Sequence, residues 1–254
     1  MTVDKKVISL IEEVAGLIDN AGFAVAFTGA GISVESGIPS FRGEDGIWNR
    51  YDPKILEYDF FRYHPEQCWP VIKEIFYTHF TGATPNAAHR FLARLEELQK
   101  LRCVITQNID GLHQKAGSRE VYCFHGDSSA LRCLKCDRVF EVTPALLSLP
   151  LPVCPECRGV LKPDFVFFGE GIPSEAYQAS FEAASNCDLM LVIGTTGEVY
   201  PAAMLPDEAR KNGARIIEIN PQRSQFSSTT AHVHLPLKAG EAAELIAGLL
   251  SITL

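Results

Sequence analysis

Four cysteines in two tight pairs are the residues of this sequence best suited to bind a metal ion. Cys133 and Cys136 form the first pair, Cys154 and Cys157 form the second, and residues 137–153 lie between them. A C-x-x-C spacing lets two thiolates contact one ion, and four thiolates close a tetrahedral shell around structural zinc. A redox role would need one pair at a strand-to-helix junction and would leave the second pair unexplained. The spacing favours a structural Zn2+ site in a zinc-ribbon module. Because zinc ribbons often bind nucleic acid or protein, a binding module remains an alternative function.

A glycine-rich stretch, GAGISVESGIPSFRG over residues 29–43, follows the apolar run 24–28. Gly29 and Gly31 match the first two glycines of the G-x-G-x-x-G pattern for dinucleotides, but Val34 stands at the third position. In hydride-transfer enzymes that third glycine lets the helix pack closely against the strand while the cofactor lies extended. The two remaining glycines let the backbone approach phosphates, so the stretch points away from redox use of a dinucleotide.

Polar side chains follow the apolar runs that are typical of buried strands. They are Gln107, Asn108, Asp110, His125, Thr195, Thr196 and Asn220. In an open α/β sheet, ligands bind beyond the carboxyl ends of the strands. Asn108 and Asp110 could recognise a carboxamide, accepting from its NH2 group and donating to its oxygen. A histidine is the usual general base near neutral pH, whereas the threonines and Asn220 alone would be interpreted as caps, and His113 is ambiguous.

The elements that must position these residues alternate along the chain. Apolar positions at helical spacing predict a helix over 4–20, and Thr84 followed by Pro85 predicts the start of another. A final helix is expected over 241–250. Unbroken apolar runs predict strands at 24–28, 103–106, 121–124, 189–193 and 215–219. The pattern predicts an α/β fold, a Rossmann-like doubly wound parallel sheet.

Two segments interrupt this alternation. Residues 44–81 are rich in aromatic side chains and are expected to form an inserted helical lobe, and residues 126–164 carry the cysteine pairs with several prolines. Together they are expected to form a small domain. Residues 1–43, 82–125 and 165–254 would then form the Rossmann-like domain.

The bulk composition excludes some classes of partner. The net charge of −8 lacks the strong basic footprint that direct binding of nucleic acid needs. No apolar run approaches membrane-spanning length, and the first residues lack the apolar core of a signal peptide. We therefore expect a cytoplasmic protein with no nucleic-acid or membrane partner, and nothing implies an oligomer.

The order of these motifs resembles that of the sirtuins, which are NAD-dependent protein-lysine deacylases. GAGISVESGIPSFRG, QNIDGLH, the His125–Gly126 pair, both C-x-x-C pairs, PDFVFFGE, GTT and the asparagine at position 220 follow the order found in that family. The resemblance implies that NAD is a consumed co-substrate, cleaved at its glycosidic bond, and that Zn2+ is structural. The acyl group would pass from lysine to ADP-ribose, releasing nicotinamide, O-acyl-ADP-ribose and deacylated lysine. Acyl-lysine-containing proteins or peptides are the implied partners.

The resemblance also implies roles for individual residues. His125 would be the general base that activates a ribose hydroxyl, with Asn108 and Asp110 acting at the nicotinamide end. The implied cofactor-binding residues are Gly29, Ala30, Gly31, Ile32, Phe41, Arg42, Gln107, Asn108, Ile109, Asp110, Gly194, Thr195, Thr196, Asn220, Pro221 and Ala239. Phe41 and Arg42 match a mobile loop that covers the cofactor. The wall for the peptide and acyl-lysine would comprise Val166, Phe168, Gly169 and Glu170, with Val199 on the opposite side, and Cys133, Cys136, Cys154 and Cys157 match the zinc ligands.

Departures from the family pattern bear on specificity. Members that prefer acidic acyl groups use a tyrosine and an arginine three residues apart, and alignment on Trp69 puts Ile72 and Ile75 at those positions. An apolar acyl pocket for acetyl or longer fatty acyl groups is therefore expected, which includes a long-chain deacylase as an alternative. An ADP-ribosyltransferase or NAD hydrolase would not need the PDFVFFGE wall. A non-catalytic NAD sensor would not need His125.

Overall fold

Six parallel strands form the central sheet of the computed structural model, which describes residues 5–43, 46–78, 80 and 82–254. Their order across the sheet is β3 (Val121–Cys123), β2 (Cys103–Thr106), β1 (Ala24–Thr28), β7 (Leu189–Ile193), β8 (Arg215–Ile219) and β9 (Val233–Leu235). All neighbouring pairs are parallel. The chain runs outward from β1 to β3 and then returns to the other side of β1 as β7. This reversal opens a crevice at the carboxyl ends of β1 and β7, which confirms the predicted fold class.

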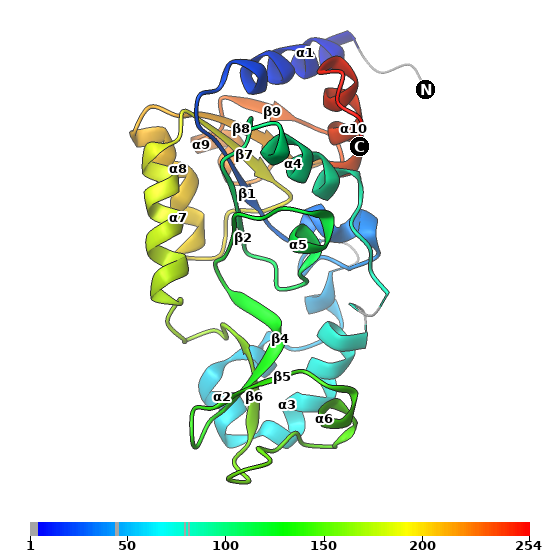
Figure 1. Ribbon diagram of the computed structural model, residues 1–254, viewed down its shortest axis with the longest axis vertical. Coiled ribbons are helices and arrows are strands. Elements are labelled where there is room, and N and C mark those ends of the chain that lie inside the picture. The colour runs from blue at the N-terminus through cyan, green and yellow to red at the C-terminus, as the bar shows by residue number, and fades with distance from the viewer. Residues whose placement is uncertain (1–4, 44–45, 79, 81) are drawn as a thin grey trace.

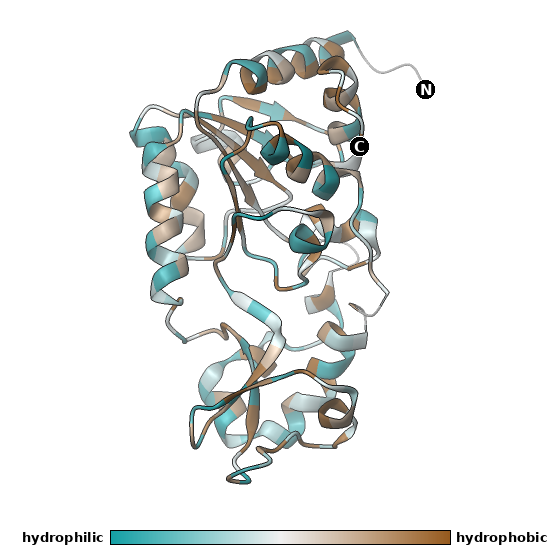
Figure 2. Cartoon of the chain, viewed as in Figure 1, coloured by the Kyte–Doolittle hydropathy of each residue, from teal (hydrophilic) through white to brown (hydrophobic). Residues whose placement is uncertain are grey.

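Helices cover both faces of this sheet (Figure 1). One face packs against α1 (Lys5–Asn20), α4 (Ala87–Glu97) and α10 (Ala239–Leu249), and the other against α7 (Ser174–Asn186) and α8 (Leu205–Lys211). Successive side chains of each strand enter opposite cores, as Ala26 and Phe27 do in β1. The central strands β1 and β7 are therefore buried along their whole length and almost entirely apolar (Figure 2), because helices cover both faces.

A smaller antiparallel sheet lies at the other end of the molecule (Figure 1). Its order is β5 (Val139–Glu141), β4 (Gly126–Cys133) and β6 (Leu161–Phe165), and α2 (Tyr58–Tyr63), α3 (Pro65–Ile72), the π-helix Lys73–Thr78 and α6 (Pro144–Ser148) lie around it. Trp69, which is fully buried, donates its indole N–H to the carbonyl of Leu161 at 2.9 Å. The inserted lobe and the cysteine-bearing segment thus share one apolar core. The exact domain boundaries expected from the sequence stay a prediction, and residues 1–4, 44–45, 79 and 81 within them lie outside the described part of the chain.

Several elements differ from expectation. The predicted helix start at Thr84 is wrong, because α4 begins at Ala87 with Asn86 as its cap. The Asn86 side chain accepts from the N–H groups of Ala88 and His89 and also donates to the Ile32 carbonyl at 2.7 Å, a tertiary contact that Thr84 does not make. The small sheet and β9 were not predicted, because β5 and β9 have only three residues each, and neither the partly buried β4 nor β6 (LKPDF) forms an unbroken apolar run.

Two loops interlock across the central crevice. After β1 the glycine-rich stretch winds into a 3-10 helix, Ala30–Ser36, and the Gly31 N–H donates to the Gly194 carbonyl at 2.8 Å. A Cβ on Gly31 would lie 2.7 Å from the Gly194 Cα, and one on Gly29 would lie 2.8 Å from the Thr195 Cβ. Gly194 itself has φ +64°, and its Cβ would lie 2.4 Å from the Ile32 nitrogen. Contact between the two loops therefore requires these glycines, whether or not a phosphate binds nearby.

Gly31→Ala should destabilise the protein by about 1–3 kcal/mol, because the new methyl overlaps backbone atoms that cannot move independently of the sheet. Gly16→Ala is the matched control. Gly16 lies in α1 with open space around its Cα, so alanine there should stabilise the protein by about 0.5–1 kcal/mol through helix propensity. Chemical denaturation of both variants measures the difference. Equal midpoints would contradict the interlock.

Candidate active site and metal centre

Side chains from three strand ends meet at Thr195. Gln107, after β2, donates its amide N–H to the Thr195 hydroxyl at 3.0 Å. Asn220, after β8, donates to the Thr195 carbonyl at 3.1 Å. Thr195 is nearly buried at the carboxyl end of β7, whereas Thr196 beside it is exposed. The crevice therefore brings together polar residues that are distant in the sequence.

A buried network holds Asn108 and Asp110 beneath the crevice. Asn108 donates its two amide protons to the Gly29 carbonyl at 3.2 Å and to the Ser33 hydroxyl at 3.1 Å. Because Gly29 offers only a carbonyl there, the amide orientation is determined and Oδ1 is left as an acceptor. The Ser33 hydroxyl donates a hydrogen bond to Asp110 Oδ2 at 2.7 Å, and Asp110 Oδ1 accepts the Leu112 N–H at 2.9 Å. Both predicted residues thus belong to one network with Ser33.

Burial raises the pKa of Asp110, and the hydrogen bonds from Leu112 and Ser33 act in the opposite direction. His89 completes the network: its Nδ1 accepts the Asn86 N–H, so Nε2 carries the proton that faces Ser33 at 3.5 Å. Burial lowers the pKa of His89 to about 4, which keeps the ring neutral. Sequence reasoning missed Ser33 and His89. Ser33 stood within the glycine-rich stretch, but no spacing rule pairs it with Asp110.

His113 lies below this network and is structural. Its Nε2 contacts the Thr28 hydroxyl at 2.9 Å, and that hydroxyl donates to Thr106 at 2.9 Å. Thr106 also accepts the backbone N–H of Asn108 at 3.1 Å. Burial lowers the pKa of His113 to about 3, so it stays neutral. The ambiguity of His113 is resolved: it supports the turn that carries Asn108.

His125 follows β3 and is half-buried at the crevice. Its Nδ1 lies 3.2 Å from the Gln107 carbonyl, and a carbonyl can only accept. Nδ1 therefore carries the proton, and in the neutral ring Nε2 keeps its lone pair. Burial lowers the pKa of His125, opposed by the hydrogen bond to Gln107, so the neutral ring predominates at neutral pH.

The predicted covering loop is held from two sides. The Phe41 ring packs on Trp48 at 5.3 Å and on Phe76 at 6.2 Å between centroids. Arg42 forms an ion pair with Glu198 at 2.9 Å, with both side chains about two-fifths exposed. Glu198 was not predicted, and it also accepts from the Thr196 hydroxyl at 3.4 Å. This exposed pair links the loop to the segment after β7.

The remaining predicted cofactor residues lie in different parts of the structure. Ala30 and Ile32 lie in the 3-10 helix after β1, and Ile109 is buried in the core of the small domain. Ala239 opens α10, whose second residue, Gly240, donates its N–H to the Glu35 carboxylate at 2.6 Å. Glu35 therefore ties the glycine-rich stretch to the start of α10. Pro221 is exposed beside Asn220.

The predicted peptide wall leaves the small sheet directly after β6. Val166 donates its N–H to the His125 carbonyl at 2.8 Å, which joins the wall to the candidate base. Phe168 is exposed, although its N–H bonds the Leu56 carbonyl at 2.8 Å and its carbonyl accepts the Tyr58 N–H at 2.9 Å. Val199 is half-buried after β7, and its carbonyl accepts the Ala203 N–H at 2.8 Å.

The four paired cysteines converge, as their spacing predicted. Their sulfur atoms all lie within 4.8 Å of one another, with Cys133 and Cys157 at 3.4 Å and Cys136 and Cys154 at 3.8 Å. Zn–S bonds of about 2.3 Å give sulfur–sulfur edges of roughly 3.8 Å in a regular tetrahedron. The donor set therefore fits Zn2+ with no position left for a substrate.

Two copies of the same turn present these sulfurs. In the first turn, the Cys133 N–H donates to the Arg138 carbonyl and the Asp137 N–H donates to the Cys133 carbonyl. In the second turn, the Cys154 N–H donates to the Gly159 carbonyl and the Arg158 N–H to the Cys154 carbonyl, at the same sequence separations. Asp137 and Arg158 occupy equivalent left-handed positions, with φ +61° and +63°. A Cβ on Gly159 would lie 2.9 Å from the Cys133 sulfur, so the second turn needs glycine there.

A model of the Sir2 family matches residues 29–201, the span from the glycine-rich stretch to the loop after β7. The chain belongs to the Sir2 family. This confirms the sirtuin resemblance inferred from the motif order. Among the described residues, no helix has the length and apolar character needed to cross a bilayer.

Curated Sir2 relatives and solved Sir2 structures cover nearly the whole chain. A protein of Aeropyrum pernix named NAD-dependent protein deacylase is 44% identical over 245 residues, 94% of this chain and 97% of that relative. One of Thermococcus kodakarensis with the same name is 42% identical over 242 residues, 91% and 92% of the two chains. A Sir2 structure with a p53 peptide and NAD+ matches with TM-score 0.88 at 36% identity, and one bound to a propionylated peptide with TM-score 0.88 at 34% identity. Each match covers 96% of this chain and 99% of that chain.

Metal analysis of the purified protein should find one zinc ion per chain. Cys136→Ser should lose the ion and lower the melting temperature, because a closed thiolate site contributes folding free energy. Cys123→Ser is the matched control, since Cys123 lies outside the cluster. Zinc content that Cys136→Ser leaves unchanged would contradict the metal centre.

Proposed function

We propose that this chain, an NAD-dependent protein deacylase of the Sir2 family, uses His125 as the general base of its reaction. The relatives from Aeropyrum pernix and Thermococcus kodakarensis carry that activity in their names. NAD is the co-substrate and zinc the structural metal. The single observation that carries the assignment of the base is the contact of His125 Nδ1 with the Gln107 carbonyl at 3.2 Å.

That contact supports a specific tautomer. With the proton on Nδ1, the neutral ring of His125 presents Nε2 as an acceptor at the crevice. The lowered pKa of His125 supports the same role, because the ring is then free to take a proton at neutral pH. The proton it accepts would come from a ribose hydroxyl of the bound dinucleotide.

NAD supplies the ribose carbon that is attacked by the acyl oxygen and the nicotinamide that departs. Asn108 Oδ1 and the Asp110 carboxylate would accept from the carboxamide NH2 group. The expected donation to the carboxamide oxygen cannot come from Asn108 in this arrangement, since both amide protons are used internally. Ser33 and His89 hold the two acceptors in place rather than touch the ligand.

The protein partner would be an acyl-lysine peptide bound along Val166, Phe168, Gly169 and Glu170, with Val199 opposite. Solved Sir2 relatives bind acetylated and propionylated peptides. The exposed Phe168 ring beside the anchored 56–58 backbone supports such a wall. The net charge of −8 supports a protein partner over nucleic acid, and we propose a cytoplasmic location.

The acyl pocket would be apolar. Ile72 and Ile75 are fully or almost fully buried in the core that contains Phe76, Phe165 and Phe167. A carboxylate delivered into such surroundings would lose its hydration, and the Lys162 ammonium that contacts Phe167 is already paired with Glu170. This supports acetyl and longer fatty acyl groups over succinyl.

His125→Ala should lower kcat/KM for deacetylation by about 10²–10⁴-fold, because the proton acceptor is gone, while NAD affinity changes little. In the unaltered enzyme, kcat/KM should fall only as pH drops below the ordinary histidine pKa of about 6.5, since the base must be neutral and its pKa is lowered. Steady-state rates and NAD titration measure both effects.

His64→Ala is the control for this experiment, because His64 is exposed in the small domain. Nicotinamide release by the unaltered enzyme should require an acetyl-lysine peptide. Release that ignores the peptide would favour an ADP-ribosyltransferase or NAD hydrolase, and full activity of His125→Ala would overturn the assigned base.

A panel of acyl groups on one peptide sequence tests the pocket. Acetyl and propionyl peptides should react with kcat/KM at least tenfold above the succinyl peptide, because the succinyl carboxylate has no cationic partner among Ile72 and Ile75. Equal rates for succinyl and acetyl would show that another residue binds the carboxylate.

A further inference from the structure

A lysine is buried where the small sheet meets the peptide wall. Lys162 lies on β6 and is 4% exposed, although lysine is almost never buried without partners. Its ammonium lies 4.1 Å from the centre of the Phe167 ring, within range of a cation–π contact. Neither the zinc site nor the catalytic crevice uses this charge.

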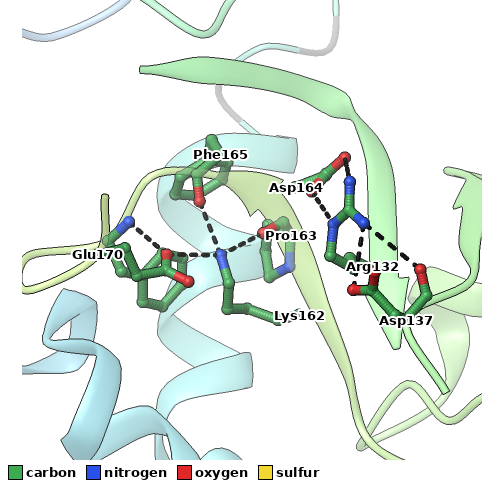
Figure 3. A network of polar contacts seen from close by, with 8 residues as sticks. Arg132, Asp137, Lys162, Pro163, Asp164, Phe165 and Glu170 are labelled. Atoms are coloured by element: carbon green, nitrogen blue, oxygen red, sulfur yellow. Dashed lines mark hydrogen bonds and ion pairs between the residues drawn. The ribbon is translucent and has the colours of Figure 1, made fainter. Parts of the chain in front are cut away.

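All three ammonium protons of Lys162 have acceptors (Figure 3). Two go to the carbonyls of Pro163 and Phe165, each at 2.7 Å, and one to Glu170 Oε2 at 3.0 Å. Pro163 and Phe165 alternate on β6, an edge strand, so both carbonyls point to the same side. The ammonium therefore ties the end of β6 to a residue of the following segment. Burial lowers the pKa of Lys162, and the Glu170 carboxylate opposes this.

Glu170 extends the tie through a tight turn. The oxygen that contacts Lys162 also accepts the Phe167 N–H at 2.7 Å, and the Glu170 N–H donates to the Phe167 carbonyl at 3.0 Å. Gly169 between them has φ +90°. The tip residue Phe168 is held from outside by the carbonyl of Leu56 and the N–H of Tyr58. The segment 166–170 is thus clamped between Lys162 and the inserted lobe.

Lys162 also neutralises the carboxylate of Glu170. The Glu170 side chain is 20% exposed, so part of it reaches the surface of the segment assigned to the peptide wall. With Lys162 beside it, the pair carries no net charge. Without Lys162, the same wall would carry an uncompensated negative charge and two buried carbonyls would lose their donor.

We propose that Lys162 is a positioning residue for acyl-lysine peptide recognition: it shapes the 166–170 turn and neutralises Glu170, without touching NAD or the acyl group. This rests on the proposed function, because the peptide wall belongs to it. Lys162 would therefore govern peptide affinity and tolerance of charge next to the acyl-lysine, while the chemistry at His125 proceeds unchanged.

The test is steady-state kinetics of the full chain with an acetyl-lysine peptide. Lys162→Met should raise KM for the peptide at least tenfold, with kcat changed less than threefold and KM for NAD within twofold. It should also favour a peptide with arginine beside the acyl-lysine over one with aspartate, more than the unaltered enzyme does. The double variant Lys162→Met with Glu170→Gln should lose that charge preference, because no unpaired carboxylate remains.

Arg132→Met is the matched control. Arg132 lies opposite Lys162 in the neighbouring strand, and its side-chain hydrogen bonds and ion pairs go to Asp164, at 2.8 Å, and Asp137, at 3.2 Å, rather than to segment 166–170 (Figure 3). Its KM for the peptide should stay within twofold. If Lys162→Met does not fold, Glu170→Gln alone should give the same KM split with a smaller change.

The results of these assays distinguish failure of the proposed function from failure of the positioning role of Lys162. An unaltered enzyme whose nicotinamide release ignores the peptide would defeat the proposed function itself. An active enzyme in which Lys162→Met keeps the peptide KM and charge preference, or raises both KM values equally with a lower melting temperature, would defeat only the positioning role.

Discussion

The contact between the glycine-rich loop and the loop after β7 is the constraint on which the rest of the site depends. Gly31 and Gly194 approach so closely that neither position has room for a Cβ. This contact lies at the point where the strand order reverses, so it brings the ends of β1 and β7 together. It directs the 3-10 helix Ala30–Ser36 across the crevice and thereby sets where Ser33 and Glu35 point.

Two tethers then follow from the placement of that helix. Ser33 reaches Asn108 and Asp110 from above, while Glu35 binds the first turn of α10. The rings of His89 and His113 pack together below this network, 4.9 Å apart between centroids. Both rings are neutral, because burial lowers their pKa values. Both amide protons of Asn108 are donated within the protein, to the Gly29 carbonyl and the Ser33 hydroxyl. What it offers to a ligand is a set of acceptors in a determined orientation.

β6 and the segment after it form one link between the small domain and the crevice, beside β4, which begins directly after His125. β6 begins beside the cysteine cluster, carries Lys162, and leads through Val166 to the carbonyl of His125. Trp69 fastens the inserted lobe to the same strand. β6 and its extension therefore contact the cysteine cluster, carry the buried lysine and bond the His125 backbone.

The sequence by itself determined the α/β class, five of the six strands of the central sheet, the cysteine cluster and the position of the polar residues at the strand ends. Those predictions succeed because period, spacing and apolar runs are local properties of the chain. Only the tertiary structure decided that Asn86 rather than Thr84 caps α4, and that Ser33 serves Asp110. It alone showed that close contact with Gly194 requires glycine at position 31 and that Lys162 pairs with Glu170. Each of these depends on contacts between separate elements or on a folded turn, and no local pattern encodes such contacts.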